Sequence, residues 1–327
     1  MRDIFRIILV GAGNIGSRHL QGLFNSRLPF VIEVVEPDAF NRGMAKERAD
    51  AVINKGNILN VYYHQSLDDI VSGEADLVIV ATNSDVRPAI VSEIIEKVRI
   101  RYLILEKVVF QSEQLFEKFS VLLAEKGIKT WVNCPRRLYP FYNALREKTS
   151  GRGLMTMRVA GGNWGLGCNG VHFIDLFAFL TGSDEIRYEY GRLDRLIMES
   201  KRKGFSEFSG SLGYSSEKGS LFLESWSHNN QPAVIDINTS SERWIISESA
   251  GALFYQENEN KTYKSEEIKF PLQSELTGSV ADEIITNGAS RLAELSQSEI
   301  YHSLLFRPLL EHILQISGRM TDTCPVT

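Results

Sequence analysis

The segment WGLGCNGVHFIDLF, residues 164–177, holds a histidine, His172, whose imidazole could accept or donate a proton near neutral pH. An apolar pattern typical of a helix begins around this residue. If Asn169 is the N-cap, His172 lies in the first turn, where the helix dipole disfavours an imidazolium and keeps a neutral base available. Asp175 follows one turn later. Its carboxylate would either orient the imidazole or form a structural ion pair.

A second group of residues with recognisable chemistry is the loop GAGNIG, residues 11–16, which fits the pattern G-x-G-x-x-G. The loop follows an apolar strand pattern and opens a helical one, as a dinucleotide-binding loop does. Gly11 would make the tight turn, Gly13 would let the backbone approach a pyrophosphate, and Gly16 would let the helix pack closely on the strand. The helix N-terminus would then bind the anion. The predicted cofactor contacts in this loop are Gly11, Gly13, Asn14, Ile15 and Gly16.

Glu36 ends the next strand pattern, twenty positions after Gly16, where a ribose-binding carboxylate belongs. A carboxylate accepts hydrogen bonds from a ribose diol but repels a 2′-phosphate, so Glu36 favours NAD over NADP. Arg42 lies a few residues further on and is the type of residue that accommodates a 2′-phosphate. NADP therefore stays open as the less favoured cofactor.

The elements that must hold these groups follow two different patterns. Before residue 130, short apolar runs alternate with helical patterns, which is typical of an α/β fold with a doubly wound parallel sheet. We therefore expect a Rossmann domain over residues 1–130. The predicted strands are 6–10, 30–35, 77–81, 102–105 and 129–133, and the predicted helices are 15–24, 89–98 and 113–126.

The rest of the chain, residues 131–327, predicts an α+β domain with a mostly antiparallel open sheet. A strong helical pattern over 171–180 ends at Thr181-Gly182, a typical C-terminal signal. Short strand patterns separated by turn residues follow it, and helical patterns return near the end. The predicted strands are 210–214, 220–226, 233–238, 244–248 and 252–255, and the predicted helices are 277–296 and 298–316.

The composition excludes several classes of function. A formal net charge of -5 argues against nucleic acid as the main partner, because phosphate binding needs a concentrated basic face. Three widely spaced cysteines, with no C-x-x-C pair, predict no zinc site and fit a reduced cytoplasmic protein. The apolar run at residues 7–10 is too short for a signal peptide or a membrane span.

Six segments between residues 11 and 182 carry a resemblance to a known family. In chain order they are GAGNIGSRHLQGL, VVEPD, IVATNSDVRPAIV, LILEKVVF, CPRRLYP and GVHFIDLFAFLTG. Together they resemble the Gfo/Idh/MocA family (glucose–fructose oxidoreductase, inositol dehydrogenase, rhizopine catabolism) of NAD(P)-dependent sugar oxidoreductases. The resemblance implies a Rossmann domain, a C-terminal substrate-binding domain, and a homodimer or homotetramer formed through the open sheet.

The resemblance also implies roles for individual residues of the first domain. Glu106-Lys107 falls on the family's Glu-Lys-Pro motif, whose lysine lies near the nicotinamide and the reacting carbinol. Val108 replaces the motif's proline, which is commonly associated with a cis bond. Thr82-Asn83 falls on the loop that lies along the cofactor. The implied cofactor contacts outside the glycine loop are Glu36, Thr82, Asn83 and Glu106.

In the last two of these segments, His172 falls on the family's catalytic histidine, and Arg137 falls on an arginine that leads into the second domain. Cys168 stands where the family usually has an aspartate. Lys107 and His172 are thus the predicted catalytic residues, while His19 is expected to pack at the start of the first Rossmann helix. The predicted substrate contacts are Arg137, Trp164, Cys168, Asn169 and Asp175.

These features predict an NAD(H)-dependent oxidoreductase that transfers a hydride between nicotinamide and a secondary alcohol or ketone of a sugar, sugar derivative or nucleotide-sugar. Two alternatives stay open. One is an NAD-dependent glycoside hydrolase of the same fold, which oxidises its substrate only transiently. The other is a catalytically weak NAD-binding sensor, which the absence of the aspartate at Cys168 favours.

Overall fold

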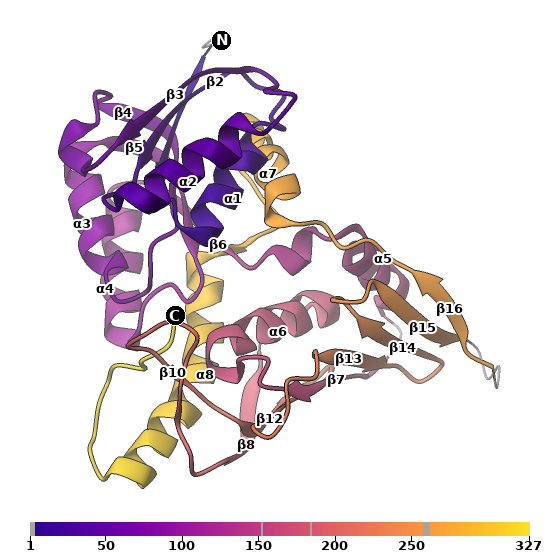
Figure 1. Ribbon diagram of the computed structural model, residues 1–327. Coiled ribbons are helices and arrows are strands. Elements are labelled where there is room, and N and C mark those ends of the chain that lie inside the picture. The colour runs from indigo at the N-terminus through magenta and orange to yellow at the C-terminus, as the bar shows by residue number, and fades with distance from the viewer. Residues whose placement is uncertain (1–3, 152, 184, 258–261) are drawn as a thin grey trace. The chain divides into compact units, whose positions relative to one another are not determined.

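A computed structural model describes residues 4–151, 153–183, 185–257 and 262–327 (Figure 1). The chain divides into two compact units. The first unit comprises Met1–Pro135 and Pro271–Ser298, and the second comprises Arg136–Phe270 and Glu299–Thr327. The predicted single boundary near residue 130 assigns residues 271–298 to the second domain, whereas they belong to the first unit.

The sheet of the first unit has seven strands in the described residues, in the order β17-β6-β5-β4-β1-β2-β3. All its pairings are parallel except that of β17 with β6. Ile7, Ile8 and Leu9 of β1 are fully buried, as expected for a strand covered on both faces. The strands are β1 (Phe5–Val10), β2 (Phe30–Val35), β3 (Ile58–His64), β4 (Glu74–Val80), β5 (Arg99–Glu106), β6 (Lys129–Asn133) and β17 (Ala293–Glu294).

The helices of the first unit cover both faces of this sheet, with α1, α2 and α7 on one side and α3 and α4 on the other (Figure 1). The predicted doubly wound α/β fold is thereby confirmed. Chain order reverses at β1, which lies between β2 and β4, and open sheets bind ligands at such a point. The helices are α1 (Asn14–Leu23), α2 (Ala39–Asp50), α3 (Arg87–Lys97), α4 (Glu113–Glu125) and α7 (Gln273–Asn287), with a short 3-10 helix at Leu67–Asp69.

Helix α7 packs closely on α1 because both helices carry a glycine at the contact. A Cβ atom on Gly22 would lie 2.8 Å from Thr277 Cβ, and one on Gly278 would lie 2.6 Å from the Gly22 carbonyl oxygen. The predicted helix 277–296 is wrong over its last turns. Gly288 takes a left-handed conformation with φ of 63° and ends α7, and residues 293–294 pair with β6.

The second unit has an eight-stranded sheet in the described residues, in the order β16-β15-β14-β13-β7-β12-β11-β8. Only β7 and β12 pair in parallel, so the predicted mostly antiparallel sheet is confirmed. The strands are β7 (Met155–Gly162), β8 (Arg187–Leu193), β11 (Gly210–Ser216), β12 (Gly219–Trp226), β13 (Val234–Asn238), β14 (Glu242–Ser247), β15 (Ala252–Glu257) and β16 (Lys264–Glu267).

Burial alternates along β12 and β14, so one face of this sheet is buried and the other is half-exposed. Helix α6 packs against β7 and β12 on the buried side. A two-stranded ribbon, β9 (Met198–Glu199) with β10 (Ser206–Glu207), lies beside α6. The helices are α5 (Pro140–Thr149), α6 (Leu166–Thr181) and α8 (Leu295–Ser317), whose residues 299–317 belong to this unit, with a 3-10 turn at Pro135–Leu138.

Helix α6 begins five residues earlier than the predicted 171–180, which corrects the expected position of the histidine. Its N-cap is Gly165, with φ of 87°. Asn169 is therefore inside the helix, and His172 lies in the second turn rather than the first. The dipole argument for a neutral His172 consequently does not hold, because the dipole's effect falls off within the first turn.

Candidate functional site

The glycine loop of the first unit lies at the reversal point of the sheet, against the chain that leaves β4. A Cβ atom on Gly11 would lie 3.0 Å from Ala81 C, and Gly11 has φ of 85°. A Cβ on Gly16 would lie 1.9 Å from the Gly11 carbonyl oxygen. Both positions therefore require glycine. A Cβ on Gly13 would meet nothing within 4 Å, so this edge of the loop faces open space.

Gly13 is the N-cap of α1, and within the described residues this helix has no side-chain cap hydrogen bond at its N-terminus. Uncapped N–H groups with open space before them form a site for an anion such as a pyrophosphate. Thr82, which follows β4, adds a second observation. Its hydroxyl oxygen is buried and has no hydrogen-bond partner in the described structure. A bound ligand would satisfy this group, so the residues present fit a dinucleotide.

A carboxylate and a guanidinium both lie near the carboxyl end of β2, each bound to the backbone there. The Glu36 carboxylate accepts the Ala12 N–H at 2.7 Å and the Asp38 N–H at 3.0 Å. The Arg42 guanidinium donates to the carbonyl of Glu36 at 2.6 Å. A ribose at this strand end would thus find both a carboxylate for its diol and a cation for a 2′-phosphate.

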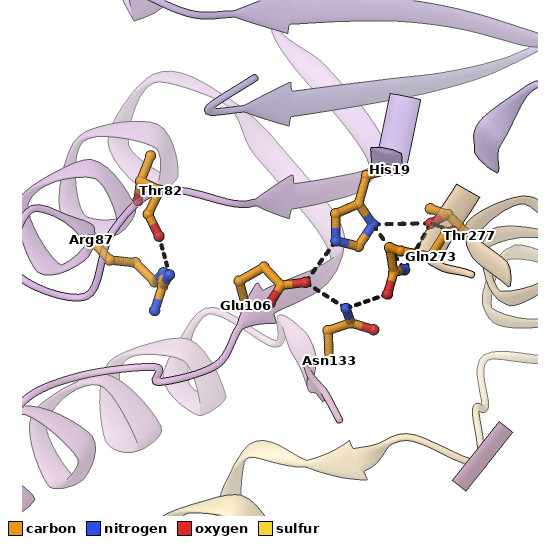
Figure 2. A network of polar contacts seen from close by, with 7 residues as sticks. All are labelled: His19, Thr82, Arg87, Glu106, Asn133, Gln273 and Thr277. Atoms are coloured by element: carbon orange, nitrogen blue, oxygen red, sulfur yellow. Dashed lines mark hydrogen bonds and ion pairs between the residues drawn. The ribbon is translucent and has the colours of Figure 1, made fainter. Parts of the chain in front are cut away.

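Glu106 and Lys107 lie at the end of β5, at the same edge of the sheet. The Glu106 carboxylate is buried and is bound by His19 Nε2 at 2.7 Å and by the Asn133 side-chain amide (Figure 2). His19 is also buried, in the second turn of α1, and Lys107 is half-buried. The Lys107–Val108 peptide bond is cis although valine replaces the proline of the family motif.

Burial by itself raises the pKa of Glu106, but the hydrogen bond and charge of His19, the Asn133 amide and the Lys107 charge together bring it below its ordinary value of 4.5. A carboxyl whose folded-state pKa is lowered stabilises the native state above its ordinary pKa. That contribution is lost as the pH falls through the lower folded-state value.

Arg87 is a buried residue of this site that was not predicted from the sequence. Its guanidinium donates to the carbonyl of Val109 at 2.7 Å and to the carbonyls of Val108 and Thr82. It therefore connects the chain after β4 to the chain after Lys107. The sequence feature that could have identified Arg87 is its position in the segment IVATNSDVRPAIV, where its charge, beside Pro88, interrupts an apolar pattern.

In the second unit, Cys168, Asn169 and His172 share one face of α6, because they are three and four residues apart. Each is half-buried, whereas Gly167, Gly170, Val171 and Phe173 are buried. Trp164, just before the helix, is half-buried and donates from Nε1 to the Glu224 carbonyl at 2.7 Å. The Asn169 amide donates to the Trp164 carbonyl at 2.8 Å.

Arg137 and Asp175 form a buried ion pair. Arg137 Nε lies 2.9 Å from both carboxylate oxygens of Asp175, which has no exposed surface. Burial raises the pKa of Asp175, and the charge and hydrogen bonds of Arg137 oppose the rise. Of the two roles expected for Asp175, the structure shows the ion pair.

A carboxylate that was not predicted lies at the N-terminus of α6. The buried side chain of Glu207, from β10, accepts the N–H groups of Gly167, of Phe208 at 2.9 Å and of Cys168 at 3.4 Å. It caps the helix where no local residue does. Nothing in the sequence pattern connects Glu207 with a helix that starts some 40 residues earlier.

Cys168→Asp is expected to destabilise the native state by about 1–2 kcal/mol at neutral pH, because the new carboxylate lies beside that of Glu207. The loss should shrink as the pH falls and one of the two carboxyls takes up a proton. Urea unfolding at about pH 7 and about pH 5 measures this, with Cys168→Asn as the uncharged control. Equal stability of the two variants at neutral pH would contradict the expectation.

The described residues lack two further kinds of feature. No group of three or more histidine, cysteine, aspartate or glutamate side chains is placed to hold a metal ion there. Among the described helices, none has the length and apolarity needed to cross a membrane.

No protein-family model matches the sequence, and no curated protein matches it. Solved structures do match. A proposed NADPH-dependent oxidoreductase from Desulfitobacterium hafniense superposes with a TM-score of 0.73 at 11% identity, over 98% of this chain and 97% of that one. An oxidoreductase from Agrobacterium radiobacter in complex with NAD+, L-tartaric acid and magnesium gives 0.71 at 13% identity, over 97% and 98%.

A third similar structure is UDP-N-acetylglucosamine 3-dehydrogenase GnnA from Acidithiobacillus ferrooxidans. It has a TM-score of 0.68 at 12% identity, and the match covers 97% of each chain. At these identities the likeness shows a shared fold.

Proposed function

We propose that this chain is an NAD(P)-dependent oxidoreductase that transfers a hydride between nicotinamide and a secondary alcohol or ketone, with NAD(H) as the preferred cofactor. The observation that carries the proposal is the anion cradle at the reversal point of the sheet. It consists of the uncapped α1 N-terminus, the open space at Gly13 and the unsatisfied Thr82 hydroxyl. Structural neighbours named as NADPH-dependent or solved with NAD+ support a nicotinamide cofactor.

The bound nicotinamide would supply the site that accepts or donates the hydride. The chain itself must handle the proton and the developing charge on the carbinol oxygen. Lys107 holds that oxygen with its ammonium group, and the imidazole of His172 accepts the hydroxyl proton during oxidation and returns it during reduction. The pyrophosphate is bound by residues of the glycine loop, namely Gly11, Gly13, Asn14, Ile15 and Gly16. Glu36 binds the ribose. Thr82 and Asn83 contact the cofactor from the loop that follows β4.

The proposed substrate is a sugar, sugar derivative or nucleotide-sugar. The half-buried face of α6 offers Asn169 for a hydroxyl, and Trp164 offers a partly exposed ring beside it. The neighbour that is a UDP-N-acetylglucosamine dehydrogenase supports this class. Arg137 and Asp175, which neutralise each other, support the site by holding α6 rather than by contacting the substrate.

A screen of nucleotide-sugars, uronic acids, amino sugars and inositols for a change in reduced-nicotinamide absorbance tests the proposal. Cofactor reduction by at least one of these alcohols is the expected result. Turnover of a glycoside without net absorbance change would identify the hydrolase alternative instead. Failure of both NAD+ and NADP+ to bind would overturn the proposal.

Glu36→Gln is expected to raise kcat/KM with NADPH relative to NADH by roughly tenfold, equivalent to about 1.4 kcal/mol. The amide oxygen can still accept the Ala12 N–H, while the negative charge facing a 2′-phosphate is removed. Initial rates with both cofactors measure the ratio. An unchanged ratio would show that Arg42, rather than Glu36, decides the preference.

We also propose that the half-exposed face of the second unit's sheet joins copies of the chain into a homodimer or homotetramer. Exposed apolar side chains on its strands, Tyr190, Val234 and Phe254, support an interface there. Sedimentation velocity measures the size of the assembly, and a monomer would refute the interface.

A cytoplasmic location is proposed because none of the three cysteines forms a disulfide, and fractionation of cells tests it.

A further inference from the structure

Arg87 is the first residue of α3, and its guanidinium joins two segments of the first unit that follow different strands. Nη1 donates to the carbonyls of Val108 and Val109, the latter at 2.7 Å. Nη2 donates to the carbonyl of Thr82 (Figure 2). The arginine and both valines are buried. Buried carbonyls need donors, and here a single side chain satisfies three of them.

These hydrogen bonds lie just beyond the end of a sheet ladder. Strand β4 pairs with β5 as far as Val80 and Leu105, where the ladder between the two strands ends. The guanidinium of Arg87 connects the same two chains a few residues further on. It therefore joins the segment that carries Thr82 to the segment that carries Lys107, at the edge where open α/β sheets bind their ligands.

We propose that Arg87 is a positioning residue, which fixes Thr82 and Lys107 relative to each other through the backbone and touches neither cofactor nor substrate. The roles of these two residues toward the cofactor and the carbinol oxygen rest on the proposed function. The bridge between the two segments does not, because its hydrogen bonds exist in the protein without a ligand.

One end of the bridge fixes the backbone of Thr82. A Cβ atom on Gly11 would lie 3.0 Å from both the nitrogen and Cγ2 of Thr82, so Thr82 packs directly on the glycine loop. Its hydroxyl oxygen is buried and has no hydrogen-bond partner in the described structure. A shift of this residue would move the hydroxyl away from the anion cradle, and cofactor affinity should fall.

The other end of the bridge fixes the chain that follows Lys107. Val108 is bonded directly to Lys107 and has no exposed surface. On the other side of Lys107, the chain is held by β5, which pairs with β6 as far as Glu106. Loss of the bridge would free one of these two points. The value of kcat should then fall, because a reacting group that is misplaced by about 1 Å acts poorly.

The first experiment measures hydrogen–deuterium exchange by mass spectrometry in the protein without cofactor or substrate. Arg87→Met keeps an apolar stem but cannot donate, so exchange should become at least about tenfold faster in segments 82–86 and 107–111 together. Arg101→Met is the matched control. It removes the charge of an exposed arginine of β5 and should leave exchange in both segments unchanged.

Arg87→Lys is a second variant, which keeps the positive charge but offers one nitrogen where the bridge uses two. Exchange should become faster in at least one of the two segments. Unchanged exchange in folded Arg87→Met protein, or in Arg87→Lys protein if Arg87→Met does not fold, would overturn the proposal. A merely stabilising arginine would lower the melting temperature and speed exchange throughout the strands of the sheet, and that outcome would overturn it too.

Titration with NAD+ by calorimetry tests the Thr82 end of the bridge. Arg87→Met should weaken binding by roughly tenfold, but only by about threefold or less in a Thr82→Val background, which already lacks the hydroxyl. Arg101→Met should bind NAD+ as the native protein does. Equal weakening in both backgrounds would show that Arg87 does not act through Thr82, contrary to the proposal.

The kinetic parameters test the Lys107 end and separate this inference from the proposed function. At saturating NAD+ and substrate, Arg87→Met should lower kcat by about 10- to 100-fold, in addition to raising KM for NAD+. If the native protein binds neither NAD+ nor NADP+, the proposed function fails, and the exchange data still decide whether the bridge exists. If the native protein is active and Arg87→Met retains its cofactor affinity and kcat, the positioning role alone fails.

Discussion

Replacing Lys107 by methionine is expected to lower kcat/KM for hydride transfer by about 100- to 10,000-fold, the range lost with a positioned acid, base or oxyanion donor. Methionine keeps the length and apolar stem of lysine but cannot donate a hydrogen bond to the carbinol oxygen. Cofactor affinity should change little, because the proposed contacts to the pyrophosphate and the ribose are in the glycine loop and at Glu36. Steady-state rates and cofactor titration by calorimetry measure the two effects separately.

Lys118→Met is the matched control for this prediction. Lys118 is an exposed lysine of α4 that lies over the Phe119 ring, 5.5 Å from its centroid, and its replacement should leave kcat/KM unchanged. His172→Asn should cause a loss of the same order as Lys107→Met. The two losses should be less than additive, because Lys107 and His172 are proposed to serve the same hydride-transfer step, one at the carbinol oxygen and the other at its proton. Activity within about threefold of the native protein in either single variant would remove that residue from the catalytic pair.

Asp175→Asn is expected to lower the free energy of unfolding by about 3–5 kcal/mol, because it leaves the Arg137 guanidinium buried without its counterion. The Tyr301 hydroxyl, 3.3 Å from Arg137, and the Phe179 ring, 5.6 Å away, remain beside the guanidinium, and neither can neutralise its charge. Urea or guanidinium unfolding followed by fluorescence measures the loss.

The control for this second prediction is the partly exposed ion pair of Arg243 and Asp236, which are 2.6 Å apart. Asp236→Asn should cost about 1 kcal/mol or less, because water solvates the remaining charge. Removing both buried charges, as Arg137→Met with Asp175→Leu, should recover most of the stability. A cost below about 1 kcal/mol for Asp175→Asn would show that the buried pair contributes little.

The parts of the fold that the sequence predicts are those with a strong local pattern. The run from Ile7 to Val10 is buried on both faces and therefore apolar throughout, which makes β1 recognisable without any knowledge of its neighbours. Helix α2 was not predicted, because only Ala45 and Ala49 of its twelve residues are buried. The edge strand β3 was missed for the same reason, since none of its residues is fully buried.

The candidate site also has a part that the sequence predicts and a part that it does not. The glycine loop can be predicted from the local sequence, since the backbone around Gly11 and Gly16 requires glycine at both positions. The hydrogen-bonded cluster around Glu106 cannot be predicted from the sequence. Its members Asn133, Gln273 and Thr277 are ordinary polar residues, and only the fold brings them together. Glu207 is a similar case. Its carboxylate caps a helix about 40 residues away in sequence, and no cap signal stands at the start of that helix.

The return of residues 271–298 to the first unit has a consequence for how the protein is made. Helix α7 and strand β17 complete this unit, yet residues 136–270 of the second unit are synthesised before them. At about 5–20 residues per second, the ribosome needs roughly 7–27 seconds to cross that interval. During this time the α1 surface that α7 later covers, with Gly22 and His19, has no native partner. The first unit therefore keeps this part of α1 uncovered during the interval, and most of the second unit, although begun later, is synthesised before α7 can complete the first.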